Sequence, residues 1–295
     1  MEQKTVIIIV GPTTSGKTDL SLKLAAHYKT KIISADSRQC YKELNIGVAK
    51  PPEEALRSIK HYFINSHSIK DDVNAQVFED YAINAVDEIF SNNDVAVMVG
   101  GTGMYVQAFC EGFDAIPEVN KEIREEIIKA YNENGLLWLQ EEVQRKDPAF
   151  WQQGERQNPQ RLMRALEVFK ATGISIINFR KKEKKQRYFQ IKKIGIDISK
   201  QQLHENINRR TDEMIKSGLV EEVKSLFQYK ELNALQTVGY KEIFDFLEGK
   251  SILPEAIEKI KINTRQYAKR QLTWFKKDKE IKWVSPDAEL TNELL

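Results

Sequence analysis

The stretch from residue 6 to residue 18, VIIIVGPTTSGKT, decides the fold class. Residues 6–10 are apolar throughout, which is typical of a strand buried on both faces of a parallel sheet. Residues 11–18 fit the phosphate-loop pattern GxxxxGK[ST], and a helical pattern covers Lys17–His27. This order of strand, loop and helix surrounds a phosphate with backbone N–H groups at a helix N-terminus. The sequence therefore predicts a site for a diphosphate or a triphosphate, without deciding between them.

The phosphate loop lacks a partner that nucleotide hydrolases usually have. In those enzymes a Walker-B aspartate, commonly at the end of a hydrophobic strand, helps to hold Mg²⁺. Here the apolar run 95–99 ends in GGTG, residues 100–103, with no carboxylate. This favours a loop that grips a diphosphate leaving group, although another strand could supply the acid. Thr18 is the candidate Mg²⁺ ligand. The predicted diphosphate-binding residues are Gly11, Thr13, Thr14, Ser15, Gly16, Lys17 and Thr18.

Two further apolar runs predict strands at residues 31–35 and 95–99. Asp36 follows the first run, and Thr102 lies in the glycine-rich turn after the second. Ligands bind beyond the carboxyl ends of the strands in open parallel sheets, so these residues and the phosphate loop should meet at one crevice. The Asp36 carboxylate could accept a proton from a nucleophile, bind a metal ion, or simply cap a helix. Thr102 could contact a ligand or merely form a tight turn.

The middle of the chain differs from both ends. Only helical patterns occur from residue 118 to about residue 172. A helix is predicted over residues 121–132, ended by Gly135. Another starts where Asn158 caps a helix with proline in its first turn, and it ends at Gly173. This segment is predicted to be a helical insertion.

Strand and helix patterns return after the insertion. A strand is predicted at residues 193–198, a helix from the capping residue Ser199 to about residue 217, and a long helix over residues 254–277. The predicted fold class is α/β, a P-loop NTPase-like parallel sheet core with an inserted helical subdomain. The expected boundaries are residues 1–117 and 188–295 for the core with its C-terminal helices, and residues 118–187 for the insertion.

Composition excludes several classes of protein. The 295-residue chain is 41% hydrophobic and 30% charged, and no apolar run approaches the roughly 20 residues that a membrane span needs. Residues 6–10 are too few for the apolar core of a signal peptide. Cys40 and Cys110 have neither a CxxC pattern nor a histidine at ligand spacing, which indicates reduced thiols. We therefore expect a cytoplasmic protein that does not contact membranes.

The net charge is only +2, but basic residues concentrate in residues 180–193 and 259–282. Such runs form either a solvated face or a surface that contacts phosphates. On the last predicted helix Lys261, Arg265 and Lys269 are spaced four apart, with aromatic residues between them. That combination suits RNA, whose unstacked bases stack on rings, while core packing is the alternative for the aromatic residues.

Two other predicted helices carry pairs of arginines. Arg161 and Arg164 are three apart and share a face beside an apolar stripe, which suits contacts to an RNA backbone. Arg209 and Arg210 are adjacent on a later helix. An arginine can hold a diphosphate through two hydrogen bonds, although a solvated surface is the default for either residue.

Several strings together resemble the tRNA dimethylallyltransferase family, also called isopentenyl-diphosphate:tRNA transferases. They span nearly the whole chain in the family's order, and their combination is more specific than the phosphate loop alone. The strings are residues 11–18 (GPTTSGKT), 36–41 (DSRQCY), 47–51 (GVAKP), 100–105 (GGTGMY), 158–168 (NPQRLMRALEV), 236–242 (QTVGYKE) and 264–275 (TRQYAKRQLTWF).

The resemblance implies an activity. A member of this family transfers the dimethylallyl group of dimethylallyl diphosphate to the exocyclic N6 amine of the adenosine 3′ of the anticodon (position 37) in tRNA, and releases diphosphate. Asp36 would be the general base, Thr102 would position the amine, and Arg210 would stabilise the departing diphosphate. Mg²⁺ would be the cofactor, with Thr18 as a ligand. The base must leave its stack to be reached, as in other base-modifying enzymes.

The implied partners are dimethylallyl diphosphate and the tRNA anticodon stem-loop, whose stem the helical insertion would clamp; we expect a monomer. Asn206 stands where many members have an arginine, and Val48 replaces a commoner threonine. No zinc-finger segment follows Leu295, so the resemblance is to the bacterial type. The implied tRNA-binding residues are Asp36, Ser37, Arg38, Gln39, Gln160, Arg161, Leu162, Met163, Arg164, Arg265 and Lys269.

Three other functions compete with this interpretation. A prenyltransferase that acts on free AMP or ATP would share the chemistry, but it would not need the helical insertion and the basic C-terminal half. A small-molecule kinase or ATPase would fit the phosphate loop, and the missing Walker-B acid counts against it. A noncatalytic RNA-binding module would explain the basic helices but would leave the phosphate loop without a role.

Overall fold

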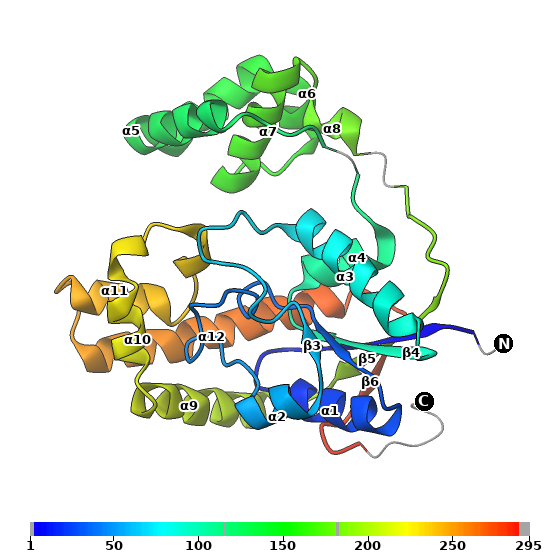
Figure 1. The fold of residues 1–295 in the computed structure, drawn as a ribbon. Coiled ribbons are helices and arrows are strands. Elements are labelled where there is room, and N and C mark those ends of the chain that lie inside the picture. Colours follow the sequence, from blue (N-terminus) through cyan, green and yellow to red (C-terminus); the bar gives the residue numbers. More distant parts are fainter. Residues whose placement is uncertain (1–2, 115, 181–182, 289–295) are drawn as a thin grey trace. The chain divides into compact units, whose positions relative to one another are not determined.

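The computed structural model describes residues 3–114, 116–180 and 183–288. It contains a six-stranded sheet of order β3-β2-β4-β1-β5-β6, in which every neighbouring pair of strands is parallel (Figure 1). This sheet with its helices confirms the predicted α/β class. The strands are β1 (Thr5–Val10), β2 (Ile32–Ser34), β3 (His61–Tyr62), β4 (Val95–Gly100), β5 (Gln190–Ile196) and β6 (Ile281–Val284).

Strand β1 is the central element of the core. All six of its residues are buried, and it pairs with β4 on one side and β5 on the other. Because successive side chains of a strand point to opposite faces, Ile8 packs with one hydrophobic cluster and Ile9 with the other. The all-apolar run of residues 6–10 is therefore explained by helices that cover both faces of the sheet.

Helices cover the two faces of the sheet from different parts of the chain. Leu24 of α1 packs with the cluster on one face, and Phe78 of α3 and Phe109 of α4 pack with the cluster on the other (Figure 1). Outside the helical insertion, the helices are α1 (Lys17–His27), α2 (Glu53–Ser58), α3 (Ala75–Phe90), α4 (Gly103–Glu111), α9 (Lys200–Lys216), α10 (Leu219–Ser225), the 3-10 turns η1 (Phe227–Tyr229) and η2 (Asn233–Leu235), α11 (Tyr240–Leu247) and α12 (Leu253–Phe275).

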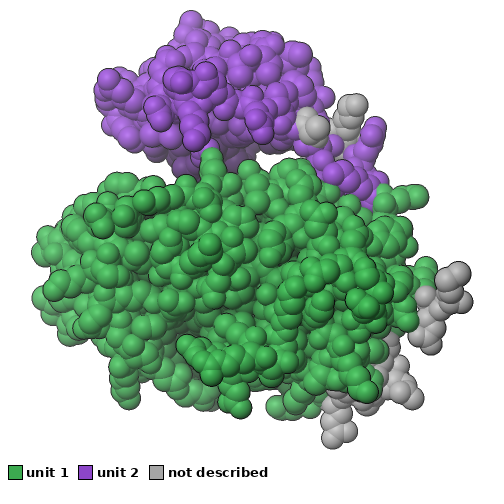
Figure 2. All heavy atoms as spheres, viewed as in Figure 1, with its two compact units in different colours: residues 1–110, 186–295 green, residues 111–185 purple. Residues whose placement is uncertain are grey.

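The chain divides into two compact units, residues 1–110 with 186–295 and residues 111–185 (Figure 2). The sequence placed the insertion at residues 118–187. In the structure the insertion starts at residue 111 and ends at residue 185. These two end residues are hydrogen-bonded to each other, since the Lys185 N–H donates to the Glu111 carbonyl at 2.8 Å. The described part of this unit is helical, with α5 (Lys121–Lys146), α6 (Pro148–Gln153), α7 (Pro159–Thr172) and α8 (Ile176–Phe179).

The insertion has its own hydrophobic core. Leu139 of α5, Phe150 of α6 and Leu162 of α7 are almost fully buried in one cluster. Gly135 has φ +76° and interrupts α5, so the predicted helix end is a kink after which the chain resumes helical structure. Helix α7 begins and ends as predicted, because the Asn158 side chain caps its first turn and Gly173 adopts the left-handed conformation after its last.

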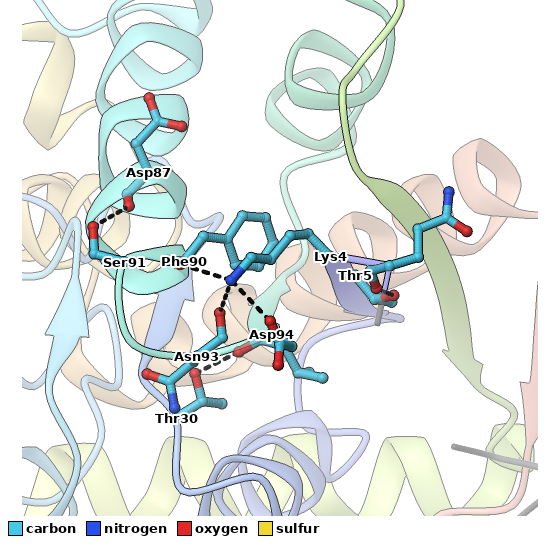
Figure 3. A network of polar contacts seen from close by, with 10 residues as sticks. Lys4, Thr5, Thr30, Asp87, Phe90, Ser91, Asn93 and Asp94 are labelled. Carbon is cyan, nitrogen blue, oxygen red and sulfur yellow. Dashed lines mark hydrogen bonds and ion pairs between the residues drawn. The ribbon is translucent and has the colours of Figure 1, made fainter. Parts of the chain in front are cut away.

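A polar network holds the amino ends of the strands, opposite to the end where a ligand would bind (Figure 3). Lys4 Nζ donates to the carbonyls of Phe90 (2.7 Å) and Asn93 (2.9 Å) and forms an ion pair of 2.8 Å with Asp94. Thr30 Oγ1 donates to the Val95 carbonyl at 2.6 Å. These contacts tie the start of β1 to the α3–β4 connection and fix the two central strands against each other.

The other predicted elements agree with the structure within a few residues. The strands expected at residues 31–35 and 193–198 are Ile32–Ser34 and Gln190–Ile196. The sequence did not predict the edge strands β3 and β6, because runs of two and four residues carry little periodic signal. Neither Cys40 nor Cys110 takes part in a disulfide bond among the residues the structure describes. No helix among the described residues has the length and apolar character that crossing a membrane requires.

Candidate active site

A cavity of about 1500 Å³ lies at the carboxyl ends of the central strands. Its wall combines the phosphate loop, the turn after β2, Gly100 and Gly101 at the end of β4, and residues of α9 and α12. Thr102 is joined to the turn after β2, because its Oγ1 accepts a hydrogen bond of 3.0 Å from the Ser37 N–H. The predicted meeting of the three motifs at one crevice is therefore confirmed.

The phosphate loop is shaped to receive an anion. Thr14 (φ +61°) and Gly16 (φ +91°) have left-handed backbone conformations, and no side chain caps the N-terminus of α1. The buried hydroxyl oxygens Thr14 Oγ1 and Ser15 Oγ have no hydrogen-bond partner in the described structure. Buried polar atoms are rarely left unpaired. The loop thus presents hydroxyl groups and a helix N-terminus that phosphate oxygens can satisfy.

Lys17 is the basic residue of the loop, and its pKa lies close to neutral pH. Its Nζ donates to the Pro12 carbonyl at 2.6 Å. Burial and the nearby positive charge of Arg210 lower the Lys17 pKa to about 7, although the negative charge of Asp36 opposes the shift. An anion beside Lys17 would favour its charged form, so a bound diphosphate would restore the full positive charge.

Helix α9 brings two side chains to the phosphate loop. Arg210 Nη1 donates to Thr13 Oγ1 at 3.1 Å, and one turn earlier Asn206 Nδ2 donates to the Thr14 carbonyl at 3.1 Å. The neighbouring Arg209 side chain is 69% exposed and lies 3.9 Å from a Glu213 carboxylate oxygen. The structure thus separates the two arginines: Arg210 faces the loop and Arg209 faces solvent.

Asp36 holds the turn that follows β2. Its Oδ1 accepts hydrogen bonds from the backbone N–H groups of Arg38 (2.8 Å) and Gln39 (3.2 Å). Residues 37–40 form a turn and no helix, so the helix-cap alternative does not apply, and the roles of base and metal ligand stay predictions. The Oδ2 atom of Asp36 makes no hydrogen bond within the described residues, and Asp36 lines the cavity. One oxygen therefore holds the turn, while the other is available to a ligand.

Two residues of α12 complete this part of the cavity, and sequence reasoning missed their roles. Tyr267 lines the cavity, and burial together with the charge of Asp36 raises the Tyr267 pKa to about 12. Gln271 is buried; its Oε1 accepts from the Thr13 N–H (2.8 Å) and its Nε2 donates to the Gly101 carbonyl (2.9 Å). The two residues are four apart in sequence, which places them on the same face of a helix. That spacing was the signal in the sequence that could have indicated their shared position.

Gly101 is needed where it stands. A Cβ atom on this residue would lie 2.1 Å from Nε2 of Gln271, which is far inside van der Waals contact. The close approach lets Gln271 bridge the phosphate loop and the turn after β4. The glycine-rich turn is therefore explained by packing against α12, as well as by the backbone freedom that the sequence indicated.

The predicted RNA-binding residues of the core differ in accessibility. Arg38 Nη1 donates to the Asn233 carbonyl at 2.8 Å, so its guanidinium is already engaged. Arg265 Nη2 donates to Asn208 Oδ1 at 2.6 Å, which places its guanidinium between α12 and α9. Lys269 is exposed. The residues of α12 that line the cavity are Ile260, Asn263, Thr264, Gln266, Tyr267, Arg270 and Gln271, so the cavity face of the helix differs from the predicted basic face.

The predicted RNA-binding residues of the insertion lie on the first turns of α7. Leu162 is fully buried and Met163 is 6% exposed, so both side chains pack in the core of this unit. Gln160 and Arg161 are exposed, and Arg164 is partly exposed with Nη1 at 3.3 Å from a carboxylate oxygen of Glu167. The polar side chains of this segment are therefore the ones that can reach a ligand.

A parallel sheet whose central strand leads into a phosphate loop, with a polar cavity at the carboxyl ends of its strands, defines a P-loop α/β protein. The family model described as IPP transferase matches residues 39–278. Named tRNA dimethylallyltransferases are similar over almost the full length: one of Christiangramia forsetii is 46% identical, covering 97% of this chain and 95% of that protein. Another, tRNA dimethylallyltransferase 1 of Bacteroides thetaiotaomicron, is 44% identical, covering 97% and 92%.

Solved structures agree with the sequence comparisons. The full-length tRNA isopentenylpyrophosphate transferase of Bacillus halodurans has a TM-score of 0.71 at 32% identity, covering 99% of this chain and 93% of that one. A eukaryotic dimethylallyltransferase, whose structures are described as snapshots of its action on tRNA, has a TM-score of 0.77 at 25% identity, covering 96% and 74%. The chain belongs to the tRNA dimethylallyltransferase (IPP transferase) family, as the sequence strings predicted.

Proposed function

We propose that this protein transfers the dimethylallyl group of dimethylallyl diphosphate to the exocyclic N6 amine of the adenosine 3′ of the anticodon (position 37) in tRNA. Family membership supports the reaction class, and the relatives named above act on tRNA. The observation that carries the proposal is the shared cavity: its lining includes a diphosphate-binding loop and the Asp36 carboxylate, of which one oxygen, Oδ1, is engaged by the backbone of its own turn.

The reaction is a direct displacement. The N6 nitrogen forms a bond to C1 of the dimethylallyl group as the bond from C1 to the diphosphate oxygen breaks, and the electron pair of that bond leaves with diphosphate. The N6 proton passes to the Asp36 carboxylate, which acts as general base. Thr102, beside this turn, accepts the Ser37 N–H and positions the amine. The aromatic amine is a weak nucleophile, so both the base and a good leaving group are needed.

Charge on the leaving diphosphate is stabilised from two sides. Lys17 and the N-terminus of α1 lie at the phosphate loop, and Arg210 reaches the same loop from α9. Donors fixed in advance stabilise a developing charge without reorganisation at the moment of reaction. Arg210 is therefore assigned to the departing diphosphate, and Arg209, on the solvent side, is not.

The site fits Mg²⁺ in the manner of phosphate-loop enzymes. Mg²⁺ prefers oxygen ligands and keeps several waters, with substrate phosphates supplying further ligands. The Thr18 hydroxyl lines the cavity next to Lys17 and offers one such oxygen, and the described residues hold no cluster of three or more acidic, histidine or cysteine side chains that would form a cage without substrate. When bound, Mg²⁺ would neutralise charge on the diphosphate.

The substrate is proposed to be the anticodon stem-loop of tRNA, with the adenosine turned out of its stack. Asp36–Gln39 would contact the nucleotide, and the exposed Gln160 and Arg161 would contact the stem from the insertion. Lys269 on α12 would contribute charge to the RNA surface. We also infer a monomer, because one chain supplies the phosphate loop, Asp36 and Arg210 of the cavity. A tRNA substrate, as the relatives have, supports a cytoplasmic location.

The test is transfer of labelled prenyl from dimethylallyl diphosphate to an unmodified anticodon stem-loop, to free AMP and to ATP in parallel. The proposal expects label on the stem-loop alone. Label only on AMP or ATP would retain the chemistry and overturn the substrate. Phosphate release from ATP without any prenyl transfer would favour a kinase or ATPase.

A further inference from the structure

The loop of residues 45–49 forms a wall of the cavity, and one carboxylate in α10 holds it. Glu222 Oε2 accepts hydrogen bonds from the N–H groups of Asn45 (3.1 Å) and Ile46 (2.8 Å), and Glu222 Oε1 accepts from the N–H of Gly47 (3.0 Å). Three consecutive backbone donors thus converge on one side chain. Hydrogen bonds to a charged acceptor are stronger than neutral ones, so the loop is firmly placed.

Tyr240 contacts the same carboxylate, and we call Glu222 and Tyr240 together the clamp. It is fully buried at the start of α11, and its hydroxyl donates to Glu222 Oε1 at 2.6 Å. Burial and the Glu222 charge raise the Tyr240 pKa, so the hydroxyl keeps its proton and remains a donor. The Tyr240 ring also packs against Gly47, where a Cβ atom would lie 2.5 Å from a ring carbon. The loop can follow this path only with glycine at position 47.

The clamped loop in turn supports the turn that carries Asp36. Gln39 Nε2 donates to the carbonyls of Val48 (3.3 Å) and Ala49 (3.0 Å), and its backbone N–H donates to Asp36 Oδ1 (3.2 Å). Ala49 has φ +46°, a region that residues other than glycine seldom occupy. The loop conformation is therefore imposed by its contacts, and Gln39 depends on that conformation for both acceptors.

We infer that Glu222, with Tyr240, is a positioning residue for the nucleotide-accepting side of the site, acting on Asp36 through the loop and Gln39. The inference rests on the proposed function. The contacts form one chain, from Glu222 to the loop N–H groups, from Val48 and Ala49 to Gln39, and from Gln39 to Asp36. The diphosphate side is held separately, by α9 and α12. The clamp should therefore govern transfer and leave diphosphate binding unchanged.

The first experiment compares Glu222→Gln with Glu221→Gln in the full-length protein. At position 222, glutamine keeps one acceptor oxygen, but its NH₂ group would face N–H or O–H groups that are also donors. Glu221 is the control, because it lies on the same helix and is exposed. We expect Glu222→Gln to lower kcat for prenyl transfer to the stem-loop by about 10- to 100-fold, as the loss of hydrogen bonds to a charged acceptor implies. The Kd for dimethylallyl diphosphate should be unchanged, and Glu221→Gln should behave as wild type. A wild-type kcat, or an equal loss of diphosphate affinity, would overturn the inference.

The second experiment asks whether Glu222 acts through Gln39. If it does, Gln39→Ala should remove most of the effect of Glu222→Gln, so that the double variant is little slower than Gln39→Ala alone. Losses that multiply would mean that Glu222 acts elsewhere. Tyr240→Phe, which keeps the ring and removes only the hydroxyl, should give a smaller loss of the same kind in a protein with wild-type melting behaviour; a wild-type kcat in this variant would remove Tyr240 from the clamp.

A third measurement separates the clamp from the proposed function. Amide hydrogen exchange at residues 45–47 should be faster in Glu222→Gln than in Glu221→Gln, because exchange reports local opening without any substrate. If the wild-type protein labels no RNA, the proposed function fails while this difference still tests the contact. Unchanged exchange at those three amides would overturn the clamp itself.

Discussion

Arg210 Nη1 donates a hydrogen bond of 3.1 Å to Thr13 Oγ1 and so joins α9 to the phosphate loop, 197 positions apart in sequence. Arg209, the adjacent residue, does not reach the loop: its side chain is 69% exposed, and its Nη2 donates to Asn206 Oδ1 at 3.2 Å on the same helix. The two side chains share a chemistry and differ in direction. They form a matched pair with which the role of the cavity arginine can be tested.

Arg210→Met should lower kcat for prenyl transfer by about 10²–10³-fold, the usual cost of removing one fixed donor to a developing negative charge. Steady-state kinetics with the stem-loop as acceptor measures the change. Arg209→Met is the control and should stay within a factor of two of wild type. Equal losses in the two variants would contradict the assignment, because only one guanidinium reaches the loop.

Asp36→Ala should lower the rate of transfer by about 10²–10⁴-fold if its carboxylate is the general base. Binding of dimethylallyl diphosphate should change little, since the phosphate loop holds that ligand. Single-turnover transfer and equilibrium binding measure the two quantities. Asp80→Ala removes an exposed carboxylate of α3 and serves as control. Unchanged turnover in Asp36→Ala would eliminate the proposed base.

Diphosphate binding should take up a proton above pH 7. Lys17 has a pKa lowered to about 7 by burial and by Arg210, so above that pH the free enzyme holds it mostly neutral. A bound diphosphate raises the pKa again, so a proton enters on binding and affinity falls as the pH rises from 7 to the higher pKa of the complex. Calorimetry in buffers of different ionisation enthalpy measures the uptake. Lys17→Met should bind more weakly and lose the uptake; uptake that persists in this variant would assign the proton to another group.

Gln271→Leu should destabilise the core by about 1–3 kcal/mol, because it leaves the Thr13 N–H and the Gly101 carbonyl without their partner. Urea unfolding, followed by a probe in the core rather than the insertion, measures the change in the free energy of unfolding. Gln266→Leu lies on the same helix at an exposed position and should change that free energy by less than about 0.5 kcal/mol. Equal effects would mean that the bridge contributes nothing specific.

The affinity for the stem-loop should fall steeply with salt, since phosphate contacts release counterions. Lys269 is exposed, and Lys269→Gln should reduce the slope of log K against log salt by about 1. Arg265 is held by Asn208 Oδ1, and its buried Nε has no hydrogen-bond partner within the described part of the chain, so Arg265→Gln should act mainly on stability. Binding titrations at several salt concentrations, with melting curves, distinguish the two variants. A flat salt response would remove α12 from the RNA surface.

Local signals carried much of the prediction. Residues 6–18 contain the strand, the phosphate loop and the start of α1 without interruption, and their chemistry depends on backbone geometry that the same residues create. Asn158 and Gly173 likewise define α7 from within its own sequence. Asp36 and Thr102 could be placed together because parallel strands end at one edge of a sheet, a rule that needs no side-chain detail.

The sequence by itself thus determined the α/β class, the helical insertion, the phosphate loop and the family. Tertiary structure decided which residues of each helix reach the cavity: Arg210 but not Arg209, and Gln271 rather than Arg265. It also decided that Glu222 holds a loop some 175 positions away. Periodicity predicts that a helix has faces, but the direction of each face depends on long-range packing against other elements, and no local pattern in the chain encodes that packing.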